Sequence, residues 1–72
     1  MHGHPMIQIQ LNGEARELPS ATTVAALIEQ LGHAGRRVAV EVNREIVPKS
    51  RHAEHRLADG DVVELVHALG GG

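Results

Sequence analysis

The chain has 72 residues, and its seven basic and nine acidic side chains give a formal charge of −2. It contains no Phe, Tyr, Trp or Cys, which excludes aromatic platforms for stacking nucleobases, disulfides, thiolate metal sites and a cysteine nucleophile. The near-balanced charge and short apolar runs argue against nucleic acid and membrane as partners, and the lack of cysteine suits a cytoplasmic protein.

The beginning of the chain predicts a short extension followed by a β-hairpin. Residues 1–5 have no regular pattern, and we interpret them as an N-terminal extension or a cloning remnant, with Met6 as the functional start. Residues 7–11 then alternate apolar and polar side chains, which is typical of a strand with one buried face. Asn12-Gly13 is a strong hairpin signal because both residues tolerate positive φ, and residues 14–18 form the returning strand.

One amphipathic helix of about ten residues is expected next. Apolar side chains recur at helical spacing and predict a single buried stripe. They are Val24, Leu27, Ile28 and Leu31. Thr22 is the expected N-cap, and Gly32 stands where a left-handed C-cap is needed.

The second half of the chain predicts three more strands. Residues 38–42 alternate, Asn43-Arg44 forms a tight turn, and a short strand over 45–47 ends before Pro48, which has no N–H to donate. Residues 49–56 are polar and predict a loop or helical turn. The last strand, residues 62–66, is the most apolar, which favours a central place in the sheet.

This order of elements predicts an α+β fold of the β-grasp type, with one helix on one face of a mixed sheet of about four or five strands. The first and last strands are expected to lie side by side in the middle of the sheet. The expected organisation is an extension at residues 1–5, a ubiquitin-like domain at 6–67 and a glycine tail at 68–72.

The glycine-rich end carries the chemistry that the sequence suggests. After His67 the chain reads Ala-Leu-Gly-Gly-Gly, and five residues can reach about 17 Å at ~3.3 Å each. Because glycine has no Cβ, Gly70 and Gly71 are suited to threading a narrow channel, and Leu69 is expected to anchor the tail there. Terminal glycines alone are often only loose ends. A strand directly before them favours a presented carboxylate on Gly72.

Five stretches of the chain resemble the ThiS family of sulfur carriers. They are IQIQLNG from Ile7, TTVAALIEQL from Thr22, VEVNREIVPKS from Val40, LADGDVVEL from Leu57 and the Gly-Gly end. The hairpin from Asn43 to Ser50 is the most telling, because its VN-x-x-IVP pattern is typical of that family. His52 departs from the pattern, since an aromatic residue is common after this segment.

The resemblance implies a carrier of thiamine thiazole biosynthesis that is not itself an enzyme. A ThiF-like adenylyltransferase would adenylate Gly72, a donor such as a cysteine desulfurase would supply sulfur, and the thiocarboxylate would serve a ThiG-like thiazole synthase. No bound cofactor is expected, since ATP and Mg²⁺ belong to the activating partner. By position Gly71 and Gly72 match the family's functional pair, and Gly70 is an added glycine.

Other functions remain alternatives at this point. They include a molybdopterin or amino-acid sulfur carrier, a ubiquitin-like protein modifier and a pure binding module. Val62 and Val66 would form an apolar docking patch leading to the tail if they face outward, while burial under a loop is the competing interpretation.

The remaining polar side chains give weaker signals. A metal site is conceivable at His52 and His55 with His67, but no companion ligand stands at an obvious spacing, so we expect solvated histidines and no metal site. His2 and His4 suggest only adventitious metal binding. Ser20, Thr23 and Ser50 have no recognisable base for nucleophilic catalysis. Several basic residues are expected at the surface, where they could contact an acidic partner. They are Arg36, Arg37, Lys49, Arg51 and Arg56.

Overall fold

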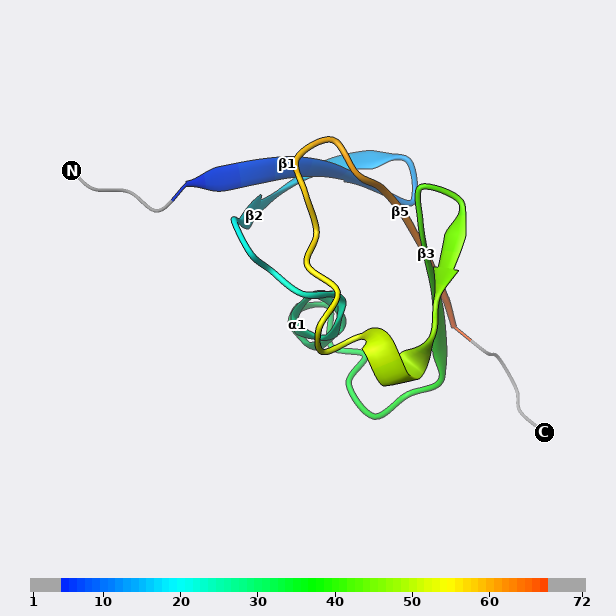
Figure 1. Ribbon diagram of the computed structural model, residues 1–72. Helices are drawn as coiled ribbons and strands as arrows, with labels where there is room; N and C mark the ends of the chain where they lie inside the picture. Colours follow the sequence, from blue (N-terminus) through cyan, green and yellow to red (C-terminus); the bar gives the residue numbers. More distant parts are fainter. Residues whose placement is uncertain (1–4, 68–72) are drawn as a thin grey trace.

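A computed structural model describes residues 5–67 of the chain. Two strands, β1 (Met6–Leu11) and β2 (Glu14–Pro19), precede the helix α1 (Val24–Gln30). Then come β3 (Val38–Val42), β4 (Glu45–Val47), a 3₁₀ turn η1 (Lys49–Arg51) and β5 (Val62–His67). The expected β-grasp fold is confirmed: a mixed sheet curves around one helix that lies in its concave side (Figure 1).

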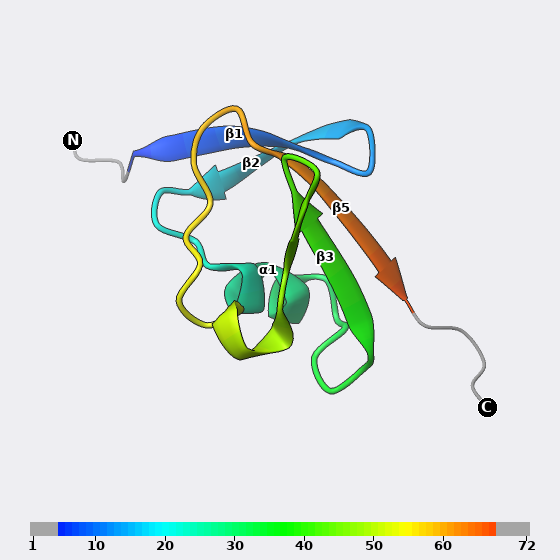
Figure 2. The ribbon, with the colours of Figure 1, turned by 45° about the vertical axis from the view of Figure 1, so that its right-hand side comes forward.

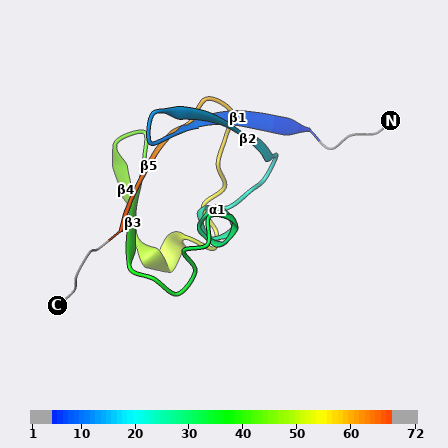
Figure 3. The same cartoon turned by 180° about the vertical axis from the view of Figure 1, so that it is seen from behind.

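The sheet order is β2-β1-β5-β3-β4, which places β5 in the centre. β5 runs parallel to β1 and antiparallel to β3, so the first and last strands lie side by side as predicted (Figure 2). β4 lies at the outer edge beside β3 (Figure 3). The main chain of β5 therefore has ladder partners on both sides, in the central place that its apolar sequence favoured.

The core is entirely aliphatic and lies between the sheet and α1. Its fully buried side chains come from β1, β2, α1, β3 and β5. They are Ile9, Leu18, Val24, Leu27, Val40 and Val63. The inward positions predicted from strand alternation and from the helical stripe are confirmed, although Ile7, Leu31 and Val38 are only partly buried and pack at the margin of this cluster.

The helix begins one residue later than predicted. Thr23, not Thr22, is the N-cap, and its side chain accepts a hydrogen bond from the Ala26 N–H at 3.1 Å. The Thr22 hydroxyl instead donates to the Pro19 carbonyl at 2.6 Å. Our prediction of Thr22 as the cap was therefore wrong.

The helix is also shorter than predicted, since it spans the seven residues Val24–Gln30. It ends where Gly32 takes a φ of +79°, as expected for a left-handed C-cap residue. Gly32 N–H donates to the Glu29 carbonyl and His33 N–H to the Ile28 carbonyl, both at 3.0 Å. This pair of hydrogen bonds is a Schellman motif, which satisfies the last carbonyls of the helix and releases the chain toward β3.

Three strand boundaries differ slightly from the sequence prediction, and the first is that β1 begins at Met6 and not at Ile7. β2 extends to Pro19, which pairs with Met6, and β5 extends one residue further, to His67, which pairs with Val38. Among the described residues, no helix is long and apolar enough to cross a membrane. Residues 68–72, and with them the predicted tail Leu69 to Gly72, lie outside the described range.

Candidate functional site

The candidate site is the end of β5, because this strand leads directly to the glycine run. Strand alternation turns Val63 and Leu65 into the core and leaves Val62 and Val66 exposed, by 42% and 63% respectively. The competing interpretation, burial of these two valines under a loop, is therefore wrong. The outer face of β5 carries an apolar strip that ends beside the point where the tail begins.

Neighbouring strands extend this outer face. Ala39 on β3 is directly opposite Val66, and Ile46 on β4 is 69% exposed and opposite Glu41. We call the exposed side chains of Ala39, Ile46, Val62 and Val66 the outer apolar face. No Phe, Tyr or Trp contributes, so any contact made here depends on small aliphatic groups.

A pair of glutamates interrupts the outer apolar face, and the sequence prediction missed it. Glu41 on β3 and Glu64 on β5 are direct cross-strand partners. Like charges directly opposite one another destabilise a sheet, so this arrangement is better suited to a surface that meets a cationic group. Only the register of β3 against β5 brings the two together, since they are far apart in sequence.

Two asparagine side chains hold β5 in place from either side. The Asn12 amide bonds the Leu65 main chain, with Oδ1 accepting from N–H at 2.9 Å and Nδ2 donating to the carbonyl at 3.2 Å. On the other side, Asn43 Oδ1 accepts from the Val62 N–H at 2.9 Å, and its own N–H donates to the Val62 carbonyl at 2.7 Å. Both asparagines stand in hairpin turns at positive φ, so the turn residues also position the functional strand.

The turn before β5 is fixed by two aspartates. Asp61 accepts from Asn43 Nδ2 at 2.9 Å and from the Ala58 N–H at 2.8 Å. Asp59 Oδ1 accepts from the Gln8 N–H at 2.8 Å. The Asp-Gly-Asp segment is thus a structural anchor that sets where β5 starts.

His67, the last residue of β5, contacts a histidine that the sequence prediction did not single out. Its Nε2 lies 2.9 Å from Nε2 of His33, and the two rings meet edge to face. Removal of the His33 ring from water, with the nearby His67 and Arg36 as smaller causes, lowers the pKa of His33 below 6.5. The contact ties the loop after α1 to the end of the strand.

The other predicted histidines do not share a site. His52 is buried rather than solvated, and its Nε2 lies 3.0 Å from the Val47 carbonyl. That carbonyl can only accept, so Nε2 carries the proton. His55 is half-buried, and no group of three or more His, Cys, Asp or Glu in residues 5–67 is arranged to hold a metal. His2 and His4 lie outside the described residues.

The remaining candidate residues, which are hydroxyl and basic side chains, cap the helix or lie at the surface. Thr23 is the helix cap, while Ser20 and Ser50 are exposed. Arg36, Arg37 and Lys49 line one groove beside α1 and β3, whereas Arg51 lies at a second hollow on the far side of η1. Arg56 is exposed and pairs through its main chain with Thr23.

A family model described as "ThiS family" matches residues 9–72. The chain belongs to the ThiS family. It is 35% identical to "Sulfur carrier protein ThiS" of Escherichia coli over 92% of this chain and 100% of that protein. Identity to the protein of the same name in Bacillus subtilis is 40%, over 89% of this chain and 98% of the relative.

Two further similarities are to a solved structure and to a much longer protein. A solved ThiS structure from Geobacter metallireducens, described as a thiamine biosynthesis protein, superposes with a TM-score of 0.77 at 28% identity, covering 92% of this chain and 100% of that one. The chain is also 47% identical to a "Thiazole synthase" of Paramagnetospirillum magneticum, with 92% of this chain aligned. It spans only 20% of that relative's length.

Proposed function

We propose that this ThiS family protein carries sulfur for thiamine thiazole biosynthesis as a thiocarboxylate on Gly72. The observation that carries the proposal is the family match through residue 72, together with end-to-end similarity to two proteins named sulfur carriers. In this proposal the reacting carboxylate belongs to Gly72, in the run Gly70-Gly71-Gly72.

The proposed chemistry has two stages, both performed by partner enzymes. The Gly72 carboxylate attacks the α-phosphate of ATP, which releases pyrophosphate and leaves an acyl-adenylate. A persulfide on a donor such as a cysteine desulfurase then attacks the acyl carbon through its outer sulfur and expels AMP, which leaves an acyl disulfide. A second thiol attacks the inner sulfur of this disulfide, so that the thiocarboxylate is released and the donor sulfur and the second thiol are left as a disulfide. The proposed role for this chain is to present the carboxylate, while a ThiF-like enzyme supplies ATP, Mg²⁺ and stabilisation of the transition state.

A ThiG-like thiazole synthase is the proposed acceptor. Two relatives support this partner, because proteins named "Thiazole synthase" contain a segment that matches this chain. We propose that a thiazole synthase receives the sulfur, and we do not propose that this chain catalyses that reaction. Since activation consumes ATP, we propose the cytoplasm as the location.

The outer apolar face is the proposed docking surface for the activating enzyme. Val62 and Val66 are exposed on the strand that leads to Gly72, and Glu41 and Glu64 lie between the exposed aliphatic groups. A partner with apolar side chains around an arginine or lysine would complement both features. Gly70, Gly71 and Leu69 are proposed to enter the partner's channel.

Intact-protein mass spectrometry tests the carrier function. The protein is incubated with a ThiF-type adenylyltransferase, ATP, Mg²⁺, cysteine and a cysteine desulfurase. We expect a mass gain equal to replacement of one oxygen by sulfur, located on the peptide that contains Gly72 and absent after deletion of Gly71 and Gly72. No such gain with an active enzyme would refute the proposal. Isopeptide conjugates to lysines would indicate a protein modifier instead.

A further inference from the structure

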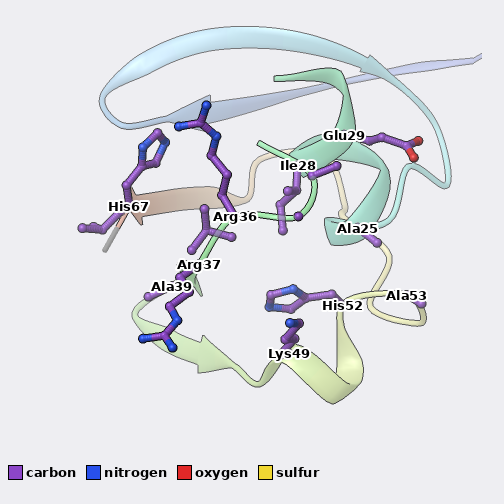
Figure 4. A pocket seen from close by; sticks show the side chains of 14 residues that line it. Ala25, Ile28, Glu29, Arg36, Arg37, Ala39, Lys49, His52, Ala53 and His67 are labelled. Carbon is purple, nitrogen blue, oxygen red and sulfur yellow. The ribbon is translucent and has the colours of Figure 1, made fainter. Parts of the chain in front are cut away.

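A groove of about 630 Å³ lies between α1, the loop that precedes β3, and η1. Its apolar walls come from separate elements, with Ile28 and Ala25 on the helix, Val38 on β3 and Ala53 after η1. Figure 4 shows Ile28 reaching in from the helix, with His52 and Lys49 facing it from the opposite side. The buried His52 ring closes the floor and is held by the Val47 carbonyl.

The start of β3 exposes an unpaired strand edge in this groove. The Asn43-Arg44 turn has two central residues, both at positive φ, so Val42 and Glu45 flank it as a hydrogen-bonded pair. Alternation then directs the N–H and carbonyl of Val38 toward the β4 side. Within residues 5–67 no strand continues there, because β4 ends at Val47, opposite Val40, and Lys49, which would come opposite Val38, begins the 3₁₀ turn η1.

Charge is distributed unevenly around this groove. Arg36, Arg37 and Lys49 line it, and Glu29 is the one carboxylate among the lining residues that the structure describes. Figure 4 shows the Glu29 side chain directed outward from the helix. Three of the seven basic and one of the nine acidic residues are thus gathered here, which leaves the rest of the chain with a net charge of −4.

We propose that this groove binds an extended segment of a partner protein in which acidic and aliphatic residues alternate. The segment adds to the open edge of β3 at Val38, and its main chain supplies the missing ladder partners. Its aliphatic side chains contact Ile28 and Ala53, while its carboxylates meet Arg36, Arg37 and Lys49 at the rim. The inference does not rest on sulfur carriage, because the segment is held by the edge of β3 and by the side chains around it and not by Gly72. Ala39 and Val66 line this groove and also belong to the outer apolar face.

NMR titration of the ¹⁵N-labelled protein with a synthetic eight-residue peptide of alternating aspartate and valine or isoleucine tests this proposal. We expect shifts of the amide signals of Val38, Lys49 and Ala53, and slower hydrogen exchange of the Val38 amide in the complex. A peptide of the same sequence with N-methylated alternate residues should bind at least tenfold more weakly, because it cannot complete the ladder. Equal binding of the two peptides would overturn the strand-addition geometry.

A matched pair of substitutions tests the charge requirement. Arg37→Glu should weaken peptide binding about tenfold, which corresponds to ~1.4 kcal/mol, whereas Arg16→Glu on β2 makes the same charge change away from the groove and should leave the affinity unchanged. Equal effects of the two variants, or equal binding of a peptide with lysine in place of aspartate, would refute the proposal. If the Val38 amide signal shifts with protein concentration in the absence of peptide, the edge of β3 binds a second copy of the chain instead.

Discussion

Asn12 and Leu65 are joined by a pair of hydrogen bonds that links the first hairpin turn to the strand leading to the glycine tail. The Asn12 side chain accepts from the Leu65 N–H at 2.9 Å and donates to its carbonyl at 3.2 Å. The register of β1 against β5 covers only two residue pairs, Gln10 with Val62 and Leu11 with Val63. The side-chain amide therefore continues this short parallel ladder where the main chain of β1 has already turned away.

Replacing Asn12 should destabilise the fold. Asn12→Gly tolerates the φ of +49° at this position but removes both hydrogen bonds to Leu65, and we expect a loss of about 1–3 kcal/mol in the free energy of unfolding. Urea denaturation measures this loss. Arg44→Gly is the matched control, because it also introduces glycine at positive φ in a two-residue turn. If the two variants lose equal stability, the hydrogen bonds between the Asn12 side chain and Leu65 do not stabilise the fold.

Acidification should weaken the contact between His33 and His67. The pKa of His33 lies below its ordinary value of 6.5, mainly because the ring is withdrawn from water, so the folded state binds this proton less tightly than the unfolded chain does. The stability contributed by this group is thus present above pH 6.5 and is lost as the pH falls through the lowered pKa. NMR titration of the ring protons measures the pKa directly.

A substitution at His67 separates its effect on the pKa of His33 from the effect of desolvation. His67→Gln removes the nearby imidazole but leaves the surrounding loop, so the pKa of His33 should rise part of the way toward 6.5. His55→Gln, which changes a histidine elsewhere, should leave it unchanged. A pKa for His33 that does not respond to His67→Gln would show that the two rings do not interact in solution.

His52 should contribute to stability although its sequence position suggested a solvated side chain. Its ring is only 8% exposed and bonds the Val47 carbonyl through Nε2. His52→Ala removes this hydrogen bond and opens a cavity, so we expect a cost of about 1–3 kcal/mol. His55→Ala should stay within about 0.5 kcal/mol of the parent. The urea concentration at the midpoint of unfolding is compared for the two variants. Similar midpoints would show that the contact between His52 and Val47 does not stabilise the fold.

Docking to the activating enzyme should depend on the end of β5. Val66→Lys places a charge on the outer apolar face, and we expect at least a tenfold drop in the rate of Gly72 adenylation, measured as ATP–pyrophosphate exchange with a ThiF-type enzyme. Ala15→Lys makes the same kind of change on the same side of the sheet, at β2. Both variants should unfold at the parent temperature, because both positions are exposed. A normal adenylation rate for Val66→Lys would exclude this docking surface.

The sequence alone determined the order of the elements and most of the core. Alternation predicted strands over residues 7–11 and 38–42, where Ile9 and Val40 are buried, and the turns at Asn12 and Asn43 were predicted because few residues tolerate positive φ. These features are local, since each depends on neighbours within a few residues. The motifs of the Asn43–Ser50 hairpin and the glycine end likewise indicated the ThiS family before the fold was known.

Only the tertiary structure decided the features that depend on contacts between distant segments. It moved the helix cap from Thr22 to Thr23, whose side chain accepts from the Ala26 N–H, while the Thr22 hydroxyl donates to Pro19. It also buried His52 beneath the groove. It brought Glu41 opposite Glu64 and joined His33 to His67. Within residues 5–67, it left the edge of β3 at Val38 without a neighbouring strand. No local pattern encodes such pairs, because strand register and packing of the whole chain determine which residues meet.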